Sequence, residues 1–176
     1  MKLKNLFVLV GAPASGKSYW ARKRLKEVDG GNGIHISRDK IRYALVNDDE
    51  DYFCRETIVY QTWIAAIKLA IDSNASNTDN IYVDATTLSV ARRKELFENL
   101  ALEERKNQVV INIVYFNTDV MTCLKRNSNR EGRECVPSSV VRRMYHSTQL
   151  PHKEELKNSL NIVYDNIYEV LPLEEE

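Results

Sequence analysis

An eight-residue segment near the amino terminus constrains the fold of this chain more than any other feature. Its residues are Gly11, Ala12, Pro13, Ala14, Ser15, Gly16, Lys17 and Ser18, which satisfy the pattern G-x-x-x-x-G-K-[ST]. The apolar run at residues 5–10 predicts a buried strand, and helix-forming residues follow the segment. A glycine turn between a strand and a helix points backbone N–H groups and the positive helix end at one phosphate. The segment therefore predicts a nucleotide-phosphate site.

Two side chains complete this expected site. Lys17 is placed to reach the β- and γ-phosphates of ATP, and Ser18 offers a hydroxyl to Mg²⁺, a hard cation that usually arrives with the nucleotide. We therefore expect ATP and Mg²⁺ as cofactors. The alternative is a glycine turn that binds nothing, and the strand in the required place before the motif argues against it.

Short β-rich runs recur at residues 34–37, 81–84, 109–115 and 162–164, with longer helical patterns between them. This alternation predicts an α/β fold with a central parallel sheet and helices on both faces. Apolar residues at i, i+3, i+4 spacing predict one helix with a buried face; they are Tyr60, Trp63, Ile64, Ile67, Ala70 and Ile71. Ser89 is expected to cap a helix, and Pro137 to lie in the first turn of another.

Length and composition set further limits. At 176 residues we expect one domain, 1–176, with an acidic tail at about 171–176 that frays. Lys plus Arg and Asp plus Glu number 25 each, so any binding to a polyanion must be local. No apolar run is long enough for a secretory signal or a membrane span. Three cysteines without C-x-x-C spacing predict neither disulfides nor zinc. We expect a cytoplasmic protein without a membrane partner; its oligomeric state stays open.

Two acids are expected at the edge of the sheet. Asp39 follows the strand at 34–37, where ligands of open α/β sheets bind, and could orient an acceptor hydroxyl and take its proton. Arg42 shares a helix face with Asp39 and could clamp an acceptor phosphate. Alternatively, Asp39 only stabilises a helix dipole and Arg42 pairs with it. Asp84 ends the strand at 81–84 and resembles a carboxylate that holds Mg²⁺, often through water, although a turn residue is the alternative.

A local cationic segment lies in the second half of the chain. Residues 125–143 contain six basic and two acidic side chains, and their centre reads as a loop after a helix. We expect a lid at about 126–136 whose arginines neutralise charge on the transferred phosphoryl group. A solvated basic surface is the alternative.

Together, residues 11–18, 37–42, 84–86, 92–93 and 125–130, followed by 136–137 and 144–145, resemble the phage-type polynucleotide 5′-kinase family. The resemblance implies that Lys17 and Ser18 serve the donor phosphates and that Asp39 is the general base. It also implies that Arg42 binds an acceptor phosphate, that Arg130 is the lid arginine on the donor phosphates, and that Arg126 lies near the adenine. The D-x-D-x-T motif of the phosphatase attached in some members is absent, so we expect no 3′-phosphatase activity.

Three functions remain open on the sequence. The first is an ATP-dependent kinase of 5′-hydroxyl ends of DNA or RNA, as in nucleic acid repair, which the Asp39–Arg42 pair and the basic lid favour. The second is a P-loop kinase of a small metabolite, antibiotic or nucleotide sugar, which the neutral net charge favours. The third is a module that switches on ATP without phosphate transfer, against which Asp39 argues. The three histidines, His35, His146 and His152, are expected to be structural or surface residues, and Arg92 and Arg93 to form structural salt bridges.

Overall fold

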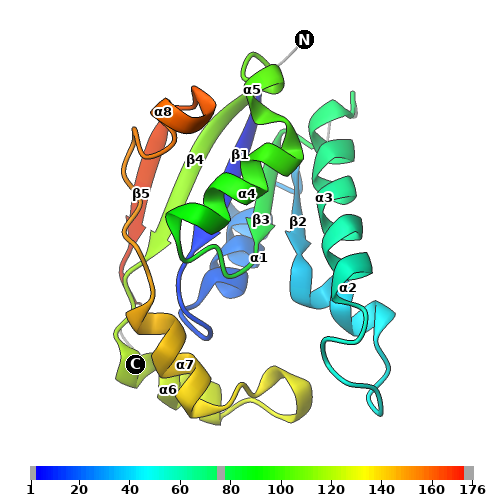
Figure 1. Ribbon diagram of the computed structural model, residues 1–176, viewed down its shortest axis with the longest axis vertical. Helices are drawn as coiled ribbons and strands as arrows, with labels where there is room; N and C mark the ends of the chain where they lie inside the picture. Colours follow the sequence, from blue (N-terminus) through cyan, green and yellow to red (C-terminus); the bar gives the residue numbers. More distant parts are fainter. Residues whose placement is uncertain (1–2, 75–77, 173–176) are drawn as a thin grey trace.

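The structure is a computed structural model that describes residues 3–74 and 78–172. Five parallel strands form one sheet in the order β2-β3-β1-β4-β5. Their bounds are β1 Lys4–Val10, β2 Gly33–Ser37, β3 Asn80–Asp84, β4 Val109–Phe116 and β5 Asn166–Val170. The predicted α/β fold with a parallel sheet is confirmed (Figure 1).

Helices connect the strands. They are α1 Lys17–Glu27, α2 Arg38–Leu45, α3 Glu56–Asp72, α4 Val90–Leu100, α5 Leu102–Arg105, α6 Val120–Ser128, the 3₁₀ turn η1 Gly132–Glu134, α7 Ser138–His146 and α8 Lys157–Leu160. None of the helices within residues 3–74 and 78–172 is both long enough and apolar enough to cross a membrane. The tail expected to fray falls mostly on residues 173–176, which lie outside the described part.

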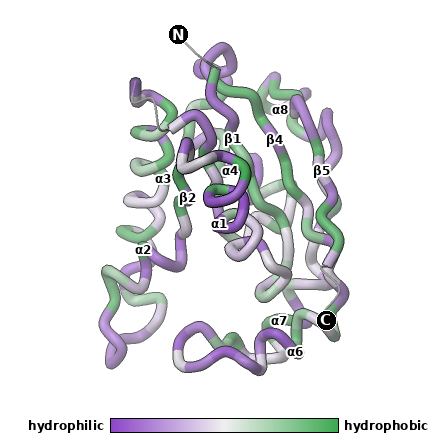
Figure 2. The backbone as a smooth tube through the Cα atoms, turned by 180° about the vertical axis from the view of Figure 1, so that it is seen from behind, coloured by the Kyte–Doolittle hydropathy of each residue, from purple (hydrophilic) through white to green (hydrophobic). Residues whose placement is uncertain are grey.

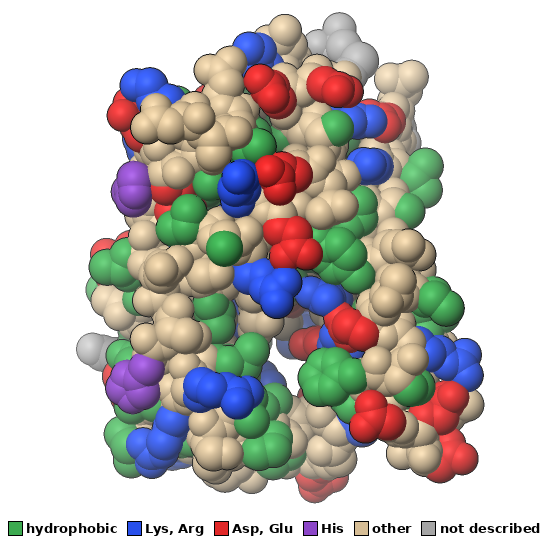
Figure 3. Space-filling view, in the orientation of Figure 1, with side chains coloured by type: hydrophobic (Ala, Val, Ile, Leu, Met, Phe, Trp, Pro, Cys, Tyr) green, Lys and Arg blue, Asp and Glu red, His purple; other side chains and the backbone are tan. Residues whose placement is uncertain are grey.

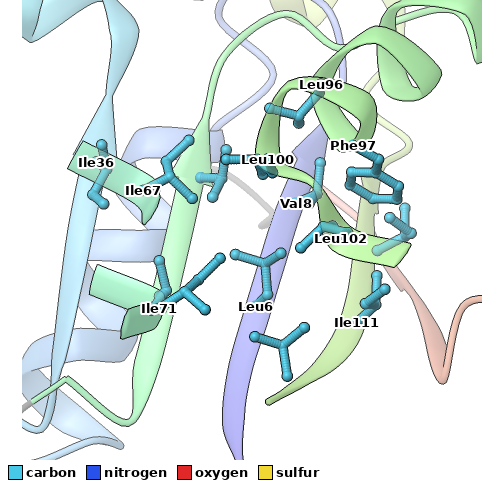
Figure 4. Close-up of a cluster of buried hydrophobic side chains, with 14 of the residues drawn as sticks. Leu6, Val8, Ile36, Ile67, Ile71, Leu96, Phe97, Leu100, Leu102 and Ile111 are labelled. Atoms are coloured by element: carbon cyan, nitrogen blue, oxygen red, sulfur yellow. The ribbon is translucent and has the colours of Figure 1, made fainter. Parts of the chain in front are cut away.

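The side chains of β1 alternate between the two faces of the sheet, and each face has its own hydrophobic cluster. Phe7 and Leu9 pack with α1, and Phe7 stacks on Tyr82 with ring centroids 4.9 Å apart. Leu6, Val8 and Val10 point to the other face, which α3, α4 and α5 cover (Figure 4). Because both faces are buried, the central strands are largely hydrophobic, whereas the loop between α6 and α7 is largely hydrophilic (Figure 2).

Local sequence signals explain where several helices begin. The Ser89 hydroxyl accepts a hydrogen bond from the Arg92 amide at 3.2 Å, so the predicted cap of α4 is confirmed. Ser37 caps α2 in the same way, through the Lys40 amide. Pro137 occupies the N-cap of α7, one residue before the helix. The predicted apolar face of α3 is also confirmed, because five of its six positions are buried and Tyr60 is partly buried against the same cluster.

The strand predicted at residues 162–164 is wrong. Ile162 and Tyr164 are buried, but they lie in an irregular segment after the left-handed residue Asn161 (φ 52°). Their side chains pack into the core, but their backbone is not a strand of the sheet. The fifth strand lies slightly later in the chain, at the edge of the sheet, and carries no buried residue. An edge strand of this kind has no strong apolar pattern, which explains the error.

Strand register brings the expected acids to the phosphate loop. Leu9, Asp84 and Ser37 are aligned across β1, β3 and β2, so Asp84 ends its strand beside the strand that leads into the loop. The carboxyl ends of parallel strands meet at one edge of the sheet, where ligands of open α/β sheets bind. Helices α6 and α7 flank this edge and are tied to the loop by a small cluster of Ala12, Cys123 and Val141.

Candidate active site

The backbone of the phosphate loop needs its two glycines. A Cβ on Gly11 would lie 2.7 Å from the Ser15 hydroxyl oxygen, and Gly16 has φ 101°, which side chains disfavour. Ala14 also has a positive φ, 62°, at a cost of roughly 1 kcal/mol. Left-handed residues of this kind turn successive N–H groups into an anion-binding concavity. The loop thus has the backbone shape that its sequence predicts.

Lys17 lies inside the loop. Its ammonium donates to the carbonyls of Gly11 and Ala12, both at 2.8 Å. Burial lowers the pKa of Lys17, while the nearby charges of Asp84 and Asp39 act in the opposite direction. The Thr118 hydroxyl also fixes the loop, because it donates a hydrogen bond to the Ser15 carbonyl at 2.9 Å. The lysine is therefore held where phosphates seated on the loop would meet its charge.

Ser18, Asp84 and His35 form a second group at the same edge. One oxygen of Asp84, Oδ2, accepts from the Ser18 hydroxyl at 2.5 Å and lies 2.9 Å from His35 Nε2. Burial would raise the pKa of Asp84, but the hydrogen bonds from His35 and Ser18 and the charge of Lys17 hold it below its usual range. Asp84 is therefore an ionised carboxylate, as a metal-binding role requires.

His35 is a residue of the site that sequence reasoning missed. Its side chain is almost completely buried, and its Nδ1 has no hydrogen-bond partner within the described residues. The available signal was weak: His35 precedes Ser37 by two residues, so both side chains lie on one face of β2, next to the end of β3. Only the pairing of β2 with β3 shows that this face meets Asp84.

The donor set fits a magnesium ion. No group of three or more His, Cys, Asp or Glu side chains suited to a metal occurs among residues 3–74 and 78–172. Mg²⁺, however, usually takes one or two protein oxygens and completes its shell with water and substrate phosphates. The Ser18 hydroxyl and the Asp84 carboxylate at the mouth of the phosphate loop match that requirement. These are the residues that would hold the ion.

Asp39 and Arg42 meet as predicted, but their surroundings differ. Asp39 Oδ1 accepts from Arg42 Nη1 at 2.5 Å and from the Tyr52 hydroxyl at 3.3 Å. The Asp39 side chain is 62% exposed and that of Arg42 only 6%. Arg42 also donates to Glu56 at 2.7 Å, and its guanidinium lies 4.7 Å from the centre of the Tyr52 ring. The carboxylate can therefore meet a substrate, whereas the guanidinium is already engaged.

A cavity of about 670 Å³ opens beside the phosphate loop, within the size range of nucleotide-type ligands. Its wall includes the end of the loop, α1, Phe116 and residues 170–172, and it also includes both predicted arginines, Arg126 and Arg130. Arg126 lies close to the loop, because a Cβ on Gly16 would lie 3.8 Å from its Nη1, and the charge of Arg130 acts on Lys17. Phe116 and residues 170–172 belong to no motif, so the sequence did not predict that they line the cavity.

The segment predicted as a lid, at about 126–136, begins with the last turn of α6 and continues as a loop that contains η1. The Asn127 side chain bonds both backbone groups of Val136, at 2.6 and 3.1 Å, and so closes the loop at its base. From there the loop extends under the edge of the sheet toward the segment after α2 (Figure 1). Arg133 reaches that segment and donates to the Val46 carbonyl at 2.6 Å. Of the cationic segment, Arg126 and Arg130 thus face the cavity and Arg133 faces α2.

The fold and this phosphate loop define a P-loop kinase-like nucleotide-binding domain. A family model described as an AAA domain matches residues 6–151, and the chain belongs to this family. No curated protein sequence matches the chain.

Several solved structures share the fold. A fungal RNA kinase matches with a TM-score of 0.66 and 12% identity, over 100% of this chain and 78% of that one. A sugar kinase from a Janibacter species matches with a TM-score of 0.55 and 15% identity, over 96% of this chain and 84% of that one. A chain of the Pnkp1/Rnl/Hen1 complex matches with a TM-score of 0.56 and 25% identity, over 72% of this chain and 40% of that one.

Proposed function

We propose that this protein is an ATP-dependent kinase that transfers the γ-phosphoryl group to a 5′-hydroxyl end of DNA or RNA. The observation that carries the proposal is the Asp39 carboxylate, which is exposed and held by Arg42 and Tyr52. It lies close enough to Lys17 for the two charges to interact. A site that only bound ATP would not require such a group at the acceptor side.

The residues divide the work as follows. The loop N–H groups and Lys17 hold the β- and γ-phosphates, and Arg126 and Arg130 approach from the lid side. Asp39 accepts a hydrogen bond from the acceptor hydroxyl and takes its proton as the oxygen attacks the γ-phosphorus. The bond from the γ-phosphorus to its bridging oxygen breaks, and ADP leaves. A magnesium ion at Ser18 and Asp84 would supply further charge neutralisation for the phosphates.

Several lines support a nucleic acid acceptor. The sequence resembles polynucleotide 5′-kinases at the positions of Asp39, Arg42 and Arg130, and one structural neighbour is an RNA kinase. Arg42 remains our candidate for an acceptor phosphate, although it would have to exchange part of its bonding to Glu56 for that role. Arg42 donates two hydrogen bonds to Glu56, and both end on the same carboxylate oxygen. A phosphate oxygen would therefore have to replace one oxygen of Glu56.

A second candidate is a kinase of a small hydroxyl compound. The low exposure of Arg42 favours it, because the guanidinium presents little surface to a phosphate. The sugar kinase among the structural neighbours has the same fold.

A transfer assay distinguishes the two candidates. The protein is incubated with γ-labelled ATP and 5′-hydroxyl DNA, 5′-hydroxyl RNA, nucleoside 3′-phosphates or simple sugars. We expect label on the nucleic acids and the nucleoside 3′-phosphates. Asp39→Asn should lower kcat by about 10² to 10⁴-fold because an amide cannot take the proton. Asp49→Asn, in the exposed loop after α2, is the matched control and should match the wild type.

Label on sugars alone would replace the proposal by the second candidate. An Asp39→Asn variant as active as the control would remove Asp39 as the base.

A further inference from the structure

A second pocket of about 360 Å³ lies between α3 and α4, over the residues that follow β3. Its charged lining residues are Arg38, Glu56, Arg92 and Glu95. On the face drawn in Figure 3, the molecule is hollowed at the carboxyl edge of the sheet, and Lys and Arg side chains gather at the upper rim of the hollow. The volume corresponds to the small end of ligand sites. No step of the proposed transfer uses this pocket.

The pocket is joined to the acceptor side of the active site through Glu56. One oxygen of this carboxylate accepts from Arg42 at 2.7 Å, and the other pairs with Arg38. Arg42 in turn holds Asp39. Residues that line the pocket are therefore linked through Arg42 to the carboxylate proposed to bind the acceptor hydroxyl.

The two arginines of the pocket differ in how firmly they are held. Arg38 lies 4.9 Å from the centre of the Tyr60 ring and 5.8 Å from that of Trp63, and its buried Nε has no hydrogen-bond partner within the described residues. Arg92 is 69% exposed, and its one ion pair among the described residues is with Glu95, which is itself 43% exposed. An exposed ion pair one helical turn apart is weak, so an incoming anion can replace Glu95 at little cost.

The charged side chains that line the pocket limit the kind of ligand that it can bind. Glu56 and Glu95 offset Arg38 and Arg92, so displacing Glu95 from Arg92 leaves one positive charge for the ligand, which suits one negative charge rather than a di- or triphosphate. Thr86 and Gln61 are exposed at its rim and add hydroxyl and amide groups. In proteins that bind single-stranded nucleic acid, arginines contact the phosphates, and neighbouring polar side chains contact the sugars and the edges of the unpaired bases.

Resting on the proposed function, we propose that this pocket binds the second nucleoside of the acceptor strand and the phosphate that follows it. The preferred acceptor is then an oligonucleotide of two or more residues rather than a mononucleotide. Arg92 contacts this second phosphate, and Arg38 forms the floor of the pocket.

The test compares two acceptors, a nucleoside 3′-phosphate and a dinucleotide with a 5′-hydroxyl and a 3′-phosphate, by kcat/KM. The wild type should prefer the dinucleotide by about tenfold or more, as expected for one charged hydrogen bond. Arg92→Ala should lose most of this preference, and Arg92→Lys should keep part of it. Lys94→Ala is the matched control, since Lys94 lies on the same helix, pairs with Glu98 at 3.6 Å and does not line the pocket. It should keep the full preference.

Four outcomes would overturn the inference. Equal kcat/KM for the two acceptors in the wild type would show that no second nucleotide is bound, and would leave the proposed kinase function intact. A preference that survives Arg92→Ala, or that is lost equally in Lys94→Ala, would show that the pocket does not provide it. Transfer to neither acceptor would overturn both this inference and the proposed function.

Discussion

Single residues of the site depend on partners far away in the sequence. His35 contacts Asp84 across a separation of 49 positions, and the sequence analysis left it as a structural or surface residue. Its neighbours carry no ligand pattern, and the contact follows from the parallel pairing of two strands that a linear reading cannot establish. Lys17, Ser18 and Asp84 were predictable because a motif and a strand end mark them directly.

We expect His35 to orient Asp84. His35→Ala removes a donor at 2.9 Å from Asp84 Oδ2, so the carboxylate is held only by Ser18 within its described hydrogen bonds. Loss of a residue that orients a metal ligand typically costs about 10- to 100-fold in metal affinity or activity. The Mg²⁺ concentration for half-maximal transfer should therefore rise by about tenfold or more, and His35→Asn should recover part of the loss.

The control is His146→Ala, at the exposed end of α7. An unchanged Mg²⁺ requirement in a folded His35→Ala protein would show that Ser18 suffices to hold the carboxylate.

At the scale of elements, the sequence predicted the strands and helices that carry many buried apolar side chains. The first four strands and the buried face of α3 were predicted because both carry dense apolar patterns. The last strand was not, because its side chains are partly or fully exposed at the sheet edge. The segment at about 126–136 was predicted as a loop, but residues 126–128 belong to α6 and Gly132–Glu134 form η1. The contacts of Arg133 with Val46 and Asp48 were not predicted, since these residues meet only in the folded chain.

Arg133 should restrain the loop at residues 129–136. Its guanidinium donates to Val46, pairs with Asp48 at 2.7 Å and lies 5.0 Å from the Tyr43 ring centre. Arg133→Ala removes all three contacts. Amides in residues 129–136 should then exchange with deuterium roughly tenfold faster, because local opening no longer breaks charged hydrogen bonds.

Arg142→Ala, an exposed arginine on α7, should leave that exchange unchanged. Identical exchange in all three proteins would mean that the Asn127–Val136 bonds alone set the mobility of the loop.

At the scale of the whole molecule, one buried ion pair connects the site to the carboxyl-terminal part of the chain. Arg93 is fully buried and bonds Glu155 through Nε and Nη2, at 2.5 and 2.8 Å. It also donates to the carbonyls of Thr87 and Gln149, which fixes the segment after β3 against the segment before α8. The structural salt bridge expected for Arg93 is confirmed, and its pairing with the Glu155 carboxylate explains why an arginine is tolerated near the start of α4.

Glu155 should make stability depend on pH. Burial would raise its pKa, but hydrogen bonds from Arg93 and Tyr164 outweigh burial and place the pKa below the ordinary 4.5. The folded state therefore binds this proton less readily than the unfolded state does. The stabilisation is complete at pH values above the unfolded pKa and is lost as the pH falls through the lowered folded pKa.

Glu155→Gln leaves Arg93 charged and buried without a carboxylate, so it should lower the free energy of unfolding at neutral pH by about 3 to 5 kcal/mol. The difference from the wild type should shrink as the pH falls well below the ordinary pKa of glutamate, where the wild-type glutamate is itself being protonated. Urea unfolding followed by circular dichroism at several pH values measures both quantities. Glu154→Gln is the matched control: its carboxylate is 61% exposed and pairs with Lys157, so its effect should stay within about 0.5 kcal/mol. A Glu155→Gln deficit that is constant from neutral to acidic pH would mean that packing around the side chain, and not the ion pair, provides the stabilisation.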